Sequence, residues 1–439
     1  MFKTLVGAFK NKDIRKKILY TLMILVVVRV GSLLPIPGVD TEYFSSLLSG
    51  INTGDLSYLS AFTGGSFERM SLFALSITPY ITSSIIMQLL AIAIPKLEEM
   101  QKEGEDGRKK IAAITRYVTI ALALIESIAM AVGFGRSGLI KGYQGFSTLH
   151  YIVSIIVVVA ALTAGSAMLM WLGERITENG VGNGISIVLL INIISGMPSD
   201  FATLYSTFVA PRTIAKGVLA AAIIIAILVV MVVLVCFLQD GERRIPVQYS
   251  QKVSGRKTFG GQSTNIPLKV NTAGVMPVIF ASSLMQFPVI IAQLFGKSYE
   301  WTRYLSSSYW CRISAPKYSI GLILYIVLLI IFAYFYTSIT FNPIEVADNL
   351  KKAGGVVPGI TPGRSTSEYL NKILNYIVFI GAVGLMIVAL IPIMCTGFFN
   401  ASVSFGGTSI IIIVGVVLET MKQIESMMVN RNYRGFLSE

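Results

Sequence analysis

Long apolar runs separated by short polar segments recur along the whole sequence, and they leave few folds open to this chain. A helix needs about 20 apolar residues to cross a hydrocarbon core of about 30 Å. Runs that approach or exceed this length lie at 18–34, 70–94, 115–134, 149–172, 183–197, 214–238, 273–295, 319–341, 373–395 and 403–424. The pattern predicts an all-α polytopic membrane protein with ten transmembrane helices, of which the fifth is the shortest.

The composition excludes several other classes of protein. Only 13% of the 439 residues are charged, whereas about a quarter are charged in soluble domains. Ten spans with their loops use up the chain and leave no room for a large soluble domain. The three cysteines lie far apart, which argues against a disulfide-stapled secreted fold. A single histidine, His150, leaves little for a histidine-based metal or catalytic site, and we expect no cofactor.

The distribution of Lys and Arg predicts the orientation of the spans. The first 17 residues carry six of these cations, and the apolar run that follows lacks a small-x-small cleavage site, which indicates an uncleaved first helix with a cytoplasmic N-terminus. With this start, the segments on the cytoplasmic side carry 24 Lys and Arg and those on the other side carry nine. This excess agrees with the positive-inside rule and places both termini in the cytoplasm.

Ten helices divide into two halves of five, and an odd number requires that a duplicated second half enters the membrane from the opposite side. The sequence therefore predicts two inverted five-helix halves with a path between them. The expected regions are a cytoplasmic N-terminus (1–17), a first half (18–197), an external linker (198–213), a second half (214–424) with cytoplasmic loops at 239–270 and 342–372, and a cytoplasmic tail (425–439).

The two long cytoplasmic loops carry signals of ordered structure. Asn342, Pro343 and Glu345 form the start signature of a short helix that Gly354 ends, and Ile245 and its alternating neighbours predict a hairpin. Such order favours a docking surface for a cytoplasmic partner, although the cations could serve topology alone. The expected docking residues are Arg243, Arg244, Lys252, Arg256, Lys257, Lys351, Lys352 and Arg364.

Three segments do not fit a plain helix bundle. The stretch 55–68 is too short to cross the membrane, and Leu56, Leu59 and Phe62 recur in it at helical spacing, which favours a re-entrant segment over an external loop. The second and seventh spans both combine prolines with several Ser, Thr and Gln residues. Such residues usually pack helices together, but two broken helices at corresponding positions of two halves also suit a mobile pair that lines a cavity.

Charged residues inside the spans are few, and the motifs for catalysis are weak. Arg29, Arg116, Glu126 and Glu419 each lie toward a span end or can reach one, so a central carboxylate for ion coupling is missing. The G-x-G-x-x-G match at 133–138 leaves a membrane helix without a preceding strand. The glycines at 180–184 lack the Lys-Ser/Thr of a phosphate-binding loop and indicate backbone flexibility instead. The sequence does not predict an enzyme.

Several blocks, distributed in order along nearly the whole chain, resemble the SecY family, the channel subunits of the bacterial protein translocase. They are Pro35–Gly38, Thr78–Ile81, Trp171–Ser186, Gly241–Ile245, Gln262–Asn271, Phe341–Pro343, Asn349–Lys352 and Gly406–Ser409. The resemblance implies an hourglass-shaped channel that conducts unfolded polypeptides across the membrane and opens sideways into lipid between the second and seventh helices.

The same resemblance implies site residues. The constriction of the pore would be Ile77, Ile81, Ile185, Leu189, Ile279 and Ile412. A plug at 55–69 would include Asp55, Leu56, Leu59, Phe62, Gly64 and Gly65. The lateral gate would include Thr82, Gln88, Ser283 and Phe287. The implied partners are SecE-type and SecG-type membrane subunits, a SecA-type ATPase, the ribosome, signal sequences, nascent polypeptides and membrane lipid, all at the bacterial cytoplasmic membrane.

One departure from the family pattern leaves alternatives open. Where the loop before the ninth span commonly reads Pro-Gly-Ile-Arg-Pro-Gly, this chain has Thr361 in place of the arginine, and Arg364 follows three residues later. Arg364 could replace the missing arginine, or the chain could be an accessory paralogue with restricted clients. A secondary transporter with inverted repeats and an insertase or scaffold without a pore are the readings from other classes.

Overall fold

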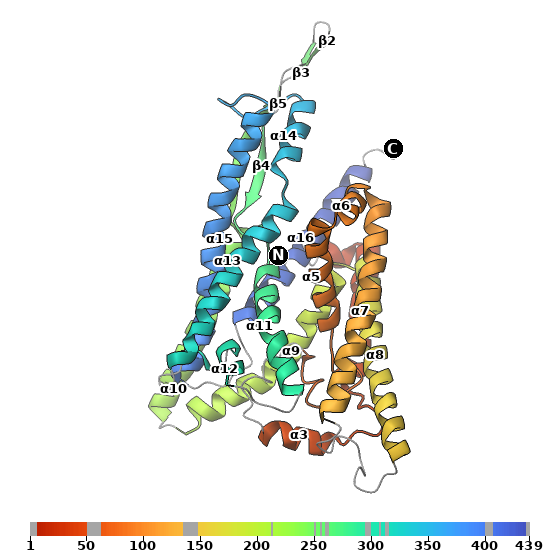
Figure 1. The fold of residues 1–439 in the computed structure, drawn as a ribbon. Helices are drawn as coiled ribbons and strands as arrows, with labels where there is room; N and C mark the ends of the chain where they lie inside the picture. The colour runs from red at the N-terminus through yellow and green to blue at the C-terminus, as the bar shows by residue number, and fades with distance from the viewer. Residues whose placement is uncertain are drawn as a thin grey trace.

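The computed structural model describes residues 7–50, 63–134, 148–211, 214–249, 252–254, 257–259, 263–294, 300–306, 309–311, 316–399 and 407–435. Each predicted span corresponds to a helix, so the prediction of a ten-helix protein is confirmed (Figure 1). These helices are α2 (Lys12–Leu33), α5 (Thr78–Ala93), α7 (Glu105–Phe134), α8 (Thr148–Asn179), α9 (Gly184–Leu204), α10 (Ile214–Asp240), α11 (Met276–Leu294), α13 (Ile320–Thr340), α15 (Arg364–Phe399) and α16 (Gly407–Gly435).

Six of the described helices are long and apolar enough to cross a membrane by length and composition. The helix α5 and the short helix α6 (Pro95–Lys102) form a further candidate that is bent by 106°. Pro95 causes this break, because it cannot donate a backbone hydrogen bond and it disfavours helical geometry at the residue before it. The remaining predicted spans, α2, α11 and α16, complete the set of ten.

The second half repeats the packing pattern of the first half. In the first half, α2 packs on α8 and α9, α7 packs on α5 and α8, and α8 packs on α9. In the second half, α10 packs on α15 and α16, α13 packs on α11 and α15, and α15 packs on α16. Each contact in one half has its counterpart five spans later, which supports an internal repeat. The halves meet where α9 packs on α16 and α7 packs on α11.

The two long loops fold together into one unit at one end of the molecule, which we call the sheet end (Figure 1). Strands β1 (Glu242–Tyr249), β4 (Ser263–Lys269) and β5 (Gly355–Val356) form an antiparallel sheet in the order β4-β1-β5, with Ile245 opposite Ile266. Strands β2 (Lys252–Ser254) and β3 (Lys257–Phe259) pair as the predicted hairpin. Ile245 packs with Leu350 of α14 (Pro343–Lys352) and Leu370 of α15.

The caps of the short helix α14 agree with its sequence signature. The Asn342 side chain accepts a hydrogen bond from the backbone N–H of Ile344 at 3.1 Å, Pro343 occupies the first turn, and two lysines lie in the last turn. Gly354 follows with a φ of +71°, a conformation that glycine adopts without steric cost.

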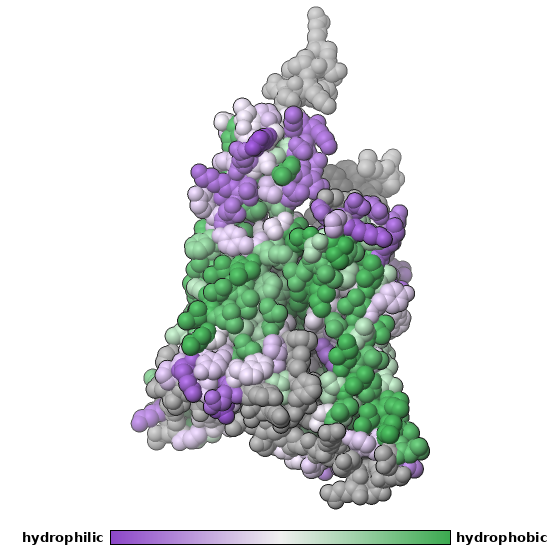
Figure 2. All heavy atoms as spheres, in the orientation of Figure 1, coloured by the Kyte–Doolittle hydropathy of each residue, from purple (hydrophilic) through white to green (hydrophobic). Residues whose placement is uncertain are grey.

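On the face shown in Figure 2, a band of apolar side chains lies between more polar ends. Many of its large apolar side chains are exposed, such as Val218, which is 65% exposed, and Phe237, which is 75% exposed. Soluble proteins rarely leave so many contiguous apolar side chains in water. The band therefore suits contact with lipid.

The structure corrects two expected boundaries. The predicted span 70–94 begins as a helix only at Thr78, because residues 64–77 form turns around a β-bridge between Ser71 and Pro35, and Met70 and Ser76 have φ values of +42° and +53°. Most of the described part of the expected linker 198–213 is helical: α9 continues to Leu204 and a π-helix, η3, covers Tyr205–Val209.

The glycines at 180–184 serve close packing, and Gly182 also uses the backbone freedom that the sequence predicts. A Cβ atom at Gly180 would collide with Thr21 on α2, and one at Gly184 would collide with the carbonyl oxygen of Gly173 on α8. Gly182, with a φ of +81°, lies against Thr420 on α16. This turn therefore joins α8 and α9 of the first half closely to α16 of the second.

Candidate functional site

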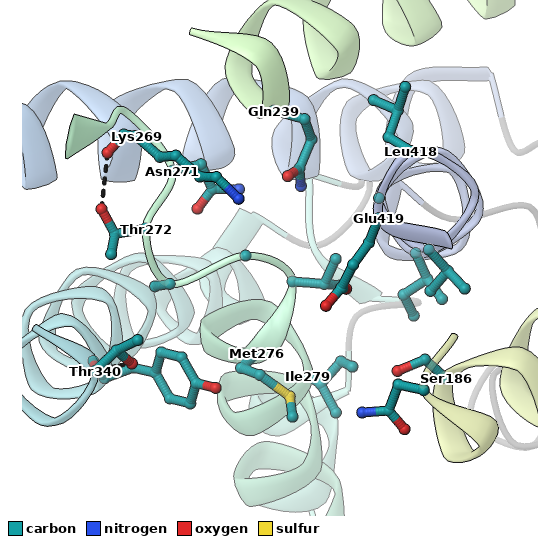
Figure 3. A pocket seen from close by; sticks show the side chains of 18 of the residues that line it. Ser186, Gln239, Lys269, Asn271, Thr272, Met276, Ile279, Thr340, Leu418 and Glu419 are labelled. Carbon is teal, nitrogen blue, oxygen red and sulfur yellow. Dashed lines mark hydrogen bonds between the residues drawn. The ribbon is translucent and has the colours of Figure 1, made fainter. Parts of the chain in front are cut away.

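A cavity of about 340 Å³ opens between the two halves (Figure 3). Its walls come from the start of α9, the end of α10, the loop between β4 and α11, the end of α13 and the middle of α16. The polar part of its wall includes Asn183, Ser186, Gln239, Asn271 and Glu419. Its apolar lining includes Leu189, Ile279 and Ile412.

All six residues expected at the constriction belong to one apolar cluster. Ile77 and Ile81 lie at the start of α5, Ile185 and Leu189 lie one turn apart on α9, Ile279 lies on α11 and Ile412 lies on α16. Ile77 and Ile412 are each 1% exposed. We call these six side chains the apolar ring, and their role as a constriction remains a prediction.

The helix α9 shows how the cavity, the ring and the next polar layer follow one another. Ser186 lines the cavity, Leu189 belongs to the ring, and Asn192 and Ser195 come next along the same helix. At a rise of about 1.5 Å per residue, Ser195 lies about 9 Å beyond Leu189 along the helix axis. Along α9, Leu189 therefore lies between the cavity residue Ser186 and a second, buried polar layer.

Residues 63–77 pack against this second layer. The Ser195 hydroxyl donates to the carbonyl oxygen of Asn192 at 2.8 Å and reaches that of Gly64 at 3.5 Å. Asn192 also donates from its Nδ2 to the hydroxyl of Ser76 at 3.2 Å. Gly64 and Gly65 have φ values of +62° and +79°. Of the expected plug residues, only these two glycines lie within the described residues; Asp55, Leu56, Leu59 and Phe62 lie outside them.

Arg29 lies toward the end of α2, as the sequence predicts, but part of its side chain is buried. It lies beside Gly64, where Nη1 would be 3.1 Å from a Cβ atom. Nη1 is buried and has no hydrogen-bond partner among the described residues. The same holds for Oδ1 of Asn192. Sequence reasoning missed this buried polar layer, because its members come from α2, residues 63–77 and α9.

The helices expected at the lateral gate, α5 and α11, both pack against α7. On α5, Thr82 donates to the carbonyl oxygen of Thr78 at 3.1 Å, and Gln88 donates to the Ser84 hydroxyl at 3.4 Å, so both residues bond within their own helix. Ser283 lies on α11. The side chain of Phe287 lies outside the described residues.

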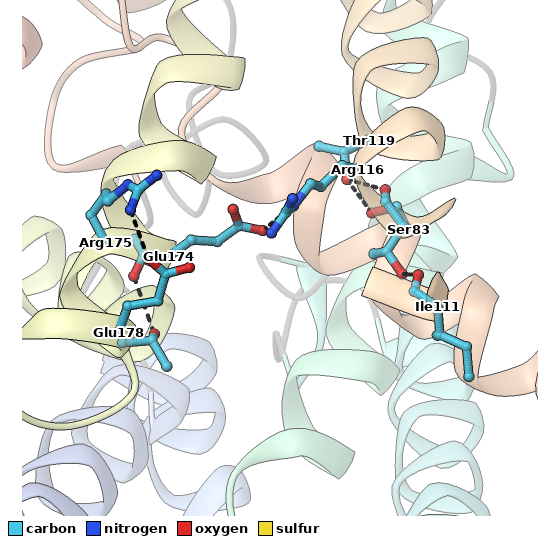
Figure 4. Close-up of polar contacts among 10 residues, drawn as sticks. Ser83, Ile111, Arg116, Thr119, Glu174, Arg175 and Glu178 are labelled. Carbon is cyan, nitrogen blue, oxygen red and sulfur yellow. Dashed lines mark hydrogen bonds and ion pairs between the residues drawn. The ribbon is translucent and has the colours of Figure 1, made fainter. Parts of the chain in front are cut away.

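Polar contacts join three helices of the first half (Figure 4). The hydroxyls of Ser83 on α5 and Thr119 on α7 are hydrogen-bonded to each other. Arg116 on α7 forms an ion pair of 2.7 Å with Glu174 on α8. In the second half, Phe280 of α11 packs edge-on against two aromatic rings of α13. The helices α5, α7 and α8 thus form one linked group, and α11 belongs with α13.

The sheet end brings the described docking residues onto one folded unit. Arg243 is exposed on β1, and Arg244 beside it pairs with Glu242 at 2.6 Å. Lys351 and Lys352 are exposed at the end of α14, and the Lys351 side chain would be 3.9 Å from a Cβ atom at Gly363. Arg256 and the side chains of Lys252 and Lys257 lie outside the described residues.

Arg364 starts α15 beside the atypical loop residue. Its side chain is 93% exposed and pairs with Glu368 at 3.1 Å. The carbonyl oxygen of Thr361 accepts a hydrogen bond from the Thr366 hydroxyl at 2.9 Å. Within the described residues, no group of three or more His, Cys, Asp or Glu side chains could hold a metal ion.

Comparison with known proteins decides the family. The sequence model of the SecY family matches residues 71–421. The chain belongs to the SecY family. It is 44% identical to the protein translocase subunit SecY of Streptomyces galbus over 446 residues, with full coverage of both chains. It is therefore a multi-pass membrane protein of that family.

Solved structures of SecY-like channels share its fold. One described as the structure of a protein conducting channel aligns with 94% of this chain and 93% of its own, at a TM-score of 0.62 and 18% identity. Another is described as showing that the plug domain of the SecY protein stabilises the closed state and maintains a membrane seal. It aligns with 94% of this chain and 92% of its own, at a TM-score of 0.61 and 18% identity.

Proposed function

We propose that this protein is a passive protein-conducting channel, which passes unfolded secretory polypeptides across the membrane and releases membrane-protein segments sideways into lipid. The observation that carries the proposal is the buried apolar cluster next to the cavity, to which α5 and α9 of the first half and α11 and α16 of the second half contribute. Membership of the SecY family supports the same function.

The chemistry of the ring suits a seal that can open. An unfolded chain carries peptide groups and charges that lipid cannot solvate, so it needs a hydrated path. Large aliphatic side chains exclude a continuous column of water by dewetting. They make no obligatory hydrogen bonds, so they can separate around a passing chain and close again. Such a channel selects for an unfolded, extended chain and not for a sequence.

Lateral release requires two groups of helices to separate, and the packing offers such a boundary. The group of α5, α7 and α8 is joined by Ser83, Thr119, Arg116 and Glu174, whereas α11 packs with α13. Opening between α5 and α11 would leave these linked groups intact. The apolar core of a signal sequence could then partition into lipid, since this part has no charge to solvate.

Residues 55–69 would seal the channel beyond the ring. The packing of Gly64 against Ser195 of α9 supports this role, because Ser195 lies about 9 Å beyond Leu189 along that helix. Displacement of this segment would then accompany opening.

A passive channel needs an external driving force, and a bound ATPase or ribosome would supply it. The exposed cations on the sheet end support docking of a SecA-type ATPase or a ribosome. SecE-type and SecG-type subunits would complete the complex in the bacterial cytoplasmic membrane, with both termini of the chain on the cytoplasmic side. Arg364 would replace the arginine missing at Thr361.

Ion conductance in planar bilayers tests the ring. Replacement of Ile81 and Ile279 by serine should make the resting channel leak ions, because hydroxyls at the ring stabilise water. Replacement of the lipid-facing Ile225 by serine is the matched control and should not leak. Unchanged conductance in the ring variant would contradict the proposal.

Capture of a client tests conduction itself. A stalled precursor should form disulfides with a cysteine placed at Leu189 or Ile279. Failure of this capture, together with counterflow of a defined small solute by the purified chain, would favour the secondary transporter.

A further inference from the structure

The cavity wall contains a buried amide that the fold leaves without a hydrogen bond. Asn271 is 5% exposed and lines the cavity, and its Nδ2 has no hydrogen-bond partner among the described residues. A buried donor without an acceptor costs stability, and an aliphatic side chain of similar size would avoid this cost. A hydrogen-bond acceptor on a ligand in the cavity would satisfy this donor.

The fold holds Asn271 in place. The residue before it, Val270, donates from its backbone N–H to the carbonyl oxygen of Gly241 at 2.8 Å, and Gly274 donates to the carbonyl oxygen of Asn271 at 3.3 Å. A Cβ atom at Gly381 of α15 would collide with the carbonyl oxygen of Val270, so α15 also packs directly on this point. Such fixed positions suit a binding group, because little freedom is lost when a ligand binds.

A second amide faces the same space. Gln239, at the end of α10, lies over Gly415 of α16, where its Nε2 would be 3.3 Å from a Cβ atom. Figure 3 shows the amide of Asn271 turned toward the side of the cavity on which Gln239 lies, with the carboxylate of Glu419 directed into the same space. Ile279 of the ring lines this cavity too. Both amides therefore lie just before the ring.

We propose that Asn271 donates a hydrogen bond from Nδ2 to a main-chain carbonyl oxygen of the polypeptide in the cavity, with Gln239 as a second amide contact to the same stretch of chain. Every residue of an extended chain offers such a carbonyl, so the contact holds the chain regardless of its side chains. The inference rests on the proposed function and adds to it a place where the chain is held before it enters the ring.

The chemistry of the wall favours a peptide group over a charged ligand. The Glu419 carboxylate disfavours an anion in the cavity. Of the two lysines that line the cavity, Lys422 is paired with Asp240 at 2.7 Å and Lys269 is exposed. A neutral amide donor matches a neutral carbonyl without the desolvation of a charge.

The experiment uses the complete channel complex in proteoliposomes, with a precursor stalled by a folded C-terminal domain. After removal of ATP, the rate at which the precursor slides back is measured by protease protection. Asn271→Leu should increase this rate about two- to tenfold, the factor expected for the loss of one hydrogen bond. Precursors with different side chains in the stalled stretch should show the same increase.

Three controls separate binding from a structural role. Asn271→Leu should keep or raise the unfolding temperature and should leave the resting ion conductance unchanged, since the ring is intact. Asn271→Asp, which keeps the shape but lacks the donor, should also increase sliding if the leucine variant does not fold. Thr340→Val removes a hydroxyl at the same cavity that already bonds to Tyr336, and it should behave as wild type.

The outcomes distinguish this inference from the proposed function. If a stalled precursor is captured at the ring but slides back at the wild-type rate in both Asn271 variants, the inference is overturned and the channel function stands. If the wild-type complex captures no precursor, the channel function fails and the inference fails with it. If Asn271→Leu lowers the unfolding temperature, the sliding rate of Asn271→Asp decides, and a wild-type rate in that variant overturns the inference.

Discussion

Replacement of Gly64 by alanine should unseat residues 63–77 and open the resting channel to ions. A Cβ atom at Gly64 would lie 2.6 Å from the Ser195 hydroxyl and 2.7 Å from the carbonyl oxygen of Asn192. Such overpacking destabilises the seated conformation by about 1–3 kcal/mol. The positive φ of +62° adds about 1–2 kcal/mol for a residue with a side chain. The seated conformation should therefore lose about 2–5 kcal/mol.

Gly65 provides the matched control. Its φ is +79°, but a Cβ atom there would meet nothing within 4 Å, so Gly65→Ala carries the backbone cost alone. The difference between the two variants is then the collision of about 1–3 kcal/mol. This difference acts only on the seated conformation, so it should shift the equilibrium toward the unseated one about 5- to 150-fold.

The assay is the resting conductance of the complete complex in planar bilayers, without client or ATPase. We expect conductance to rise from wild type to Gly65→Ala to Gly64→Ala. Addition of Ser195→Ala to Gly64→Ala should restore part of the seal, since it removes the hydroxyl but leaves the backbone oxygen of Asn192. Equal conductance of the Gly64 and Gly65 variants would refute the reasoning that this seat holds the segment.

Three further predictions concern the junction of the halves, the linked helices and the sheet end. Gly184→Ala should destabilise the folded channel by about 1–3 kcal/mol in thermal unfolding, because its Cβ atom collides with a backbone oxygen, whereas Gly196→Ala on the same helix meets nothing within 4 Å and should be neutral or stabilising. A double-mutant cycle with Arg116→Gln and Glu174→Gln should give a coupling of about 0.5–1 kcal/mol in unfolding, and no coupling would show that the pair does not join α7 to α8. Arg364→Glu should lower ATPase-driven export about two- to tenfold at low salt. It should not change the unfolding temperature, since the exposed ion pair of Arg364 with Glu368 contributes little to stability. An export defect that high salt does not reduce would contradict electrostatic docking.

The sequence predicts helices and turns where the signal is local. Ten apolar runs correspond to ten helices, since a membrane requires each crossing to satisfy its backbone internally. The cap of α14 and the alternation of Ile245 and Val247 also depend only on near neighbours. The helix start at Thr78 is different, because the positive φ of Ser76 depends on packing against Asn192, which is 116 residues away in sequence.

The candidate site is harder to predict from residues alone. In a chain that is 54% hydrophobic, nothing local distinguishes Ile412 of the ring from an isoleucine that faces lipid, so the ring residues came from the family resemblance. The polar groups of the site were missed for a related reason. Asn271 and Arg29 are single polar residues beside apolar runs, and only the fold shows that their donors are buried without partners.

The exchange of the two halves shows where the channel can open. Exchanging each helix for its counterpart maps the contact between α9 and α16 onto itself, so this contact lies on the axis of the repeat. The close packing of Gly182 against Thr420 holds it together. The contact between α7 and α11 maps onto α5 and α13, which do not pack extensively within the described residues. The contact between α7 and α11 therefore has no counterpart of similar extent.

An opening that separates α11 from α7 while α9 and α16 stay together would widen the ring, because Leu189 and Ile412 would remain near the axis while Ile279 moves away. Cross-linking α9 to α16 should therefore permit export, whereas cross-linking α7 to α11 should block it, and the reverse result would place the axis elsewhere.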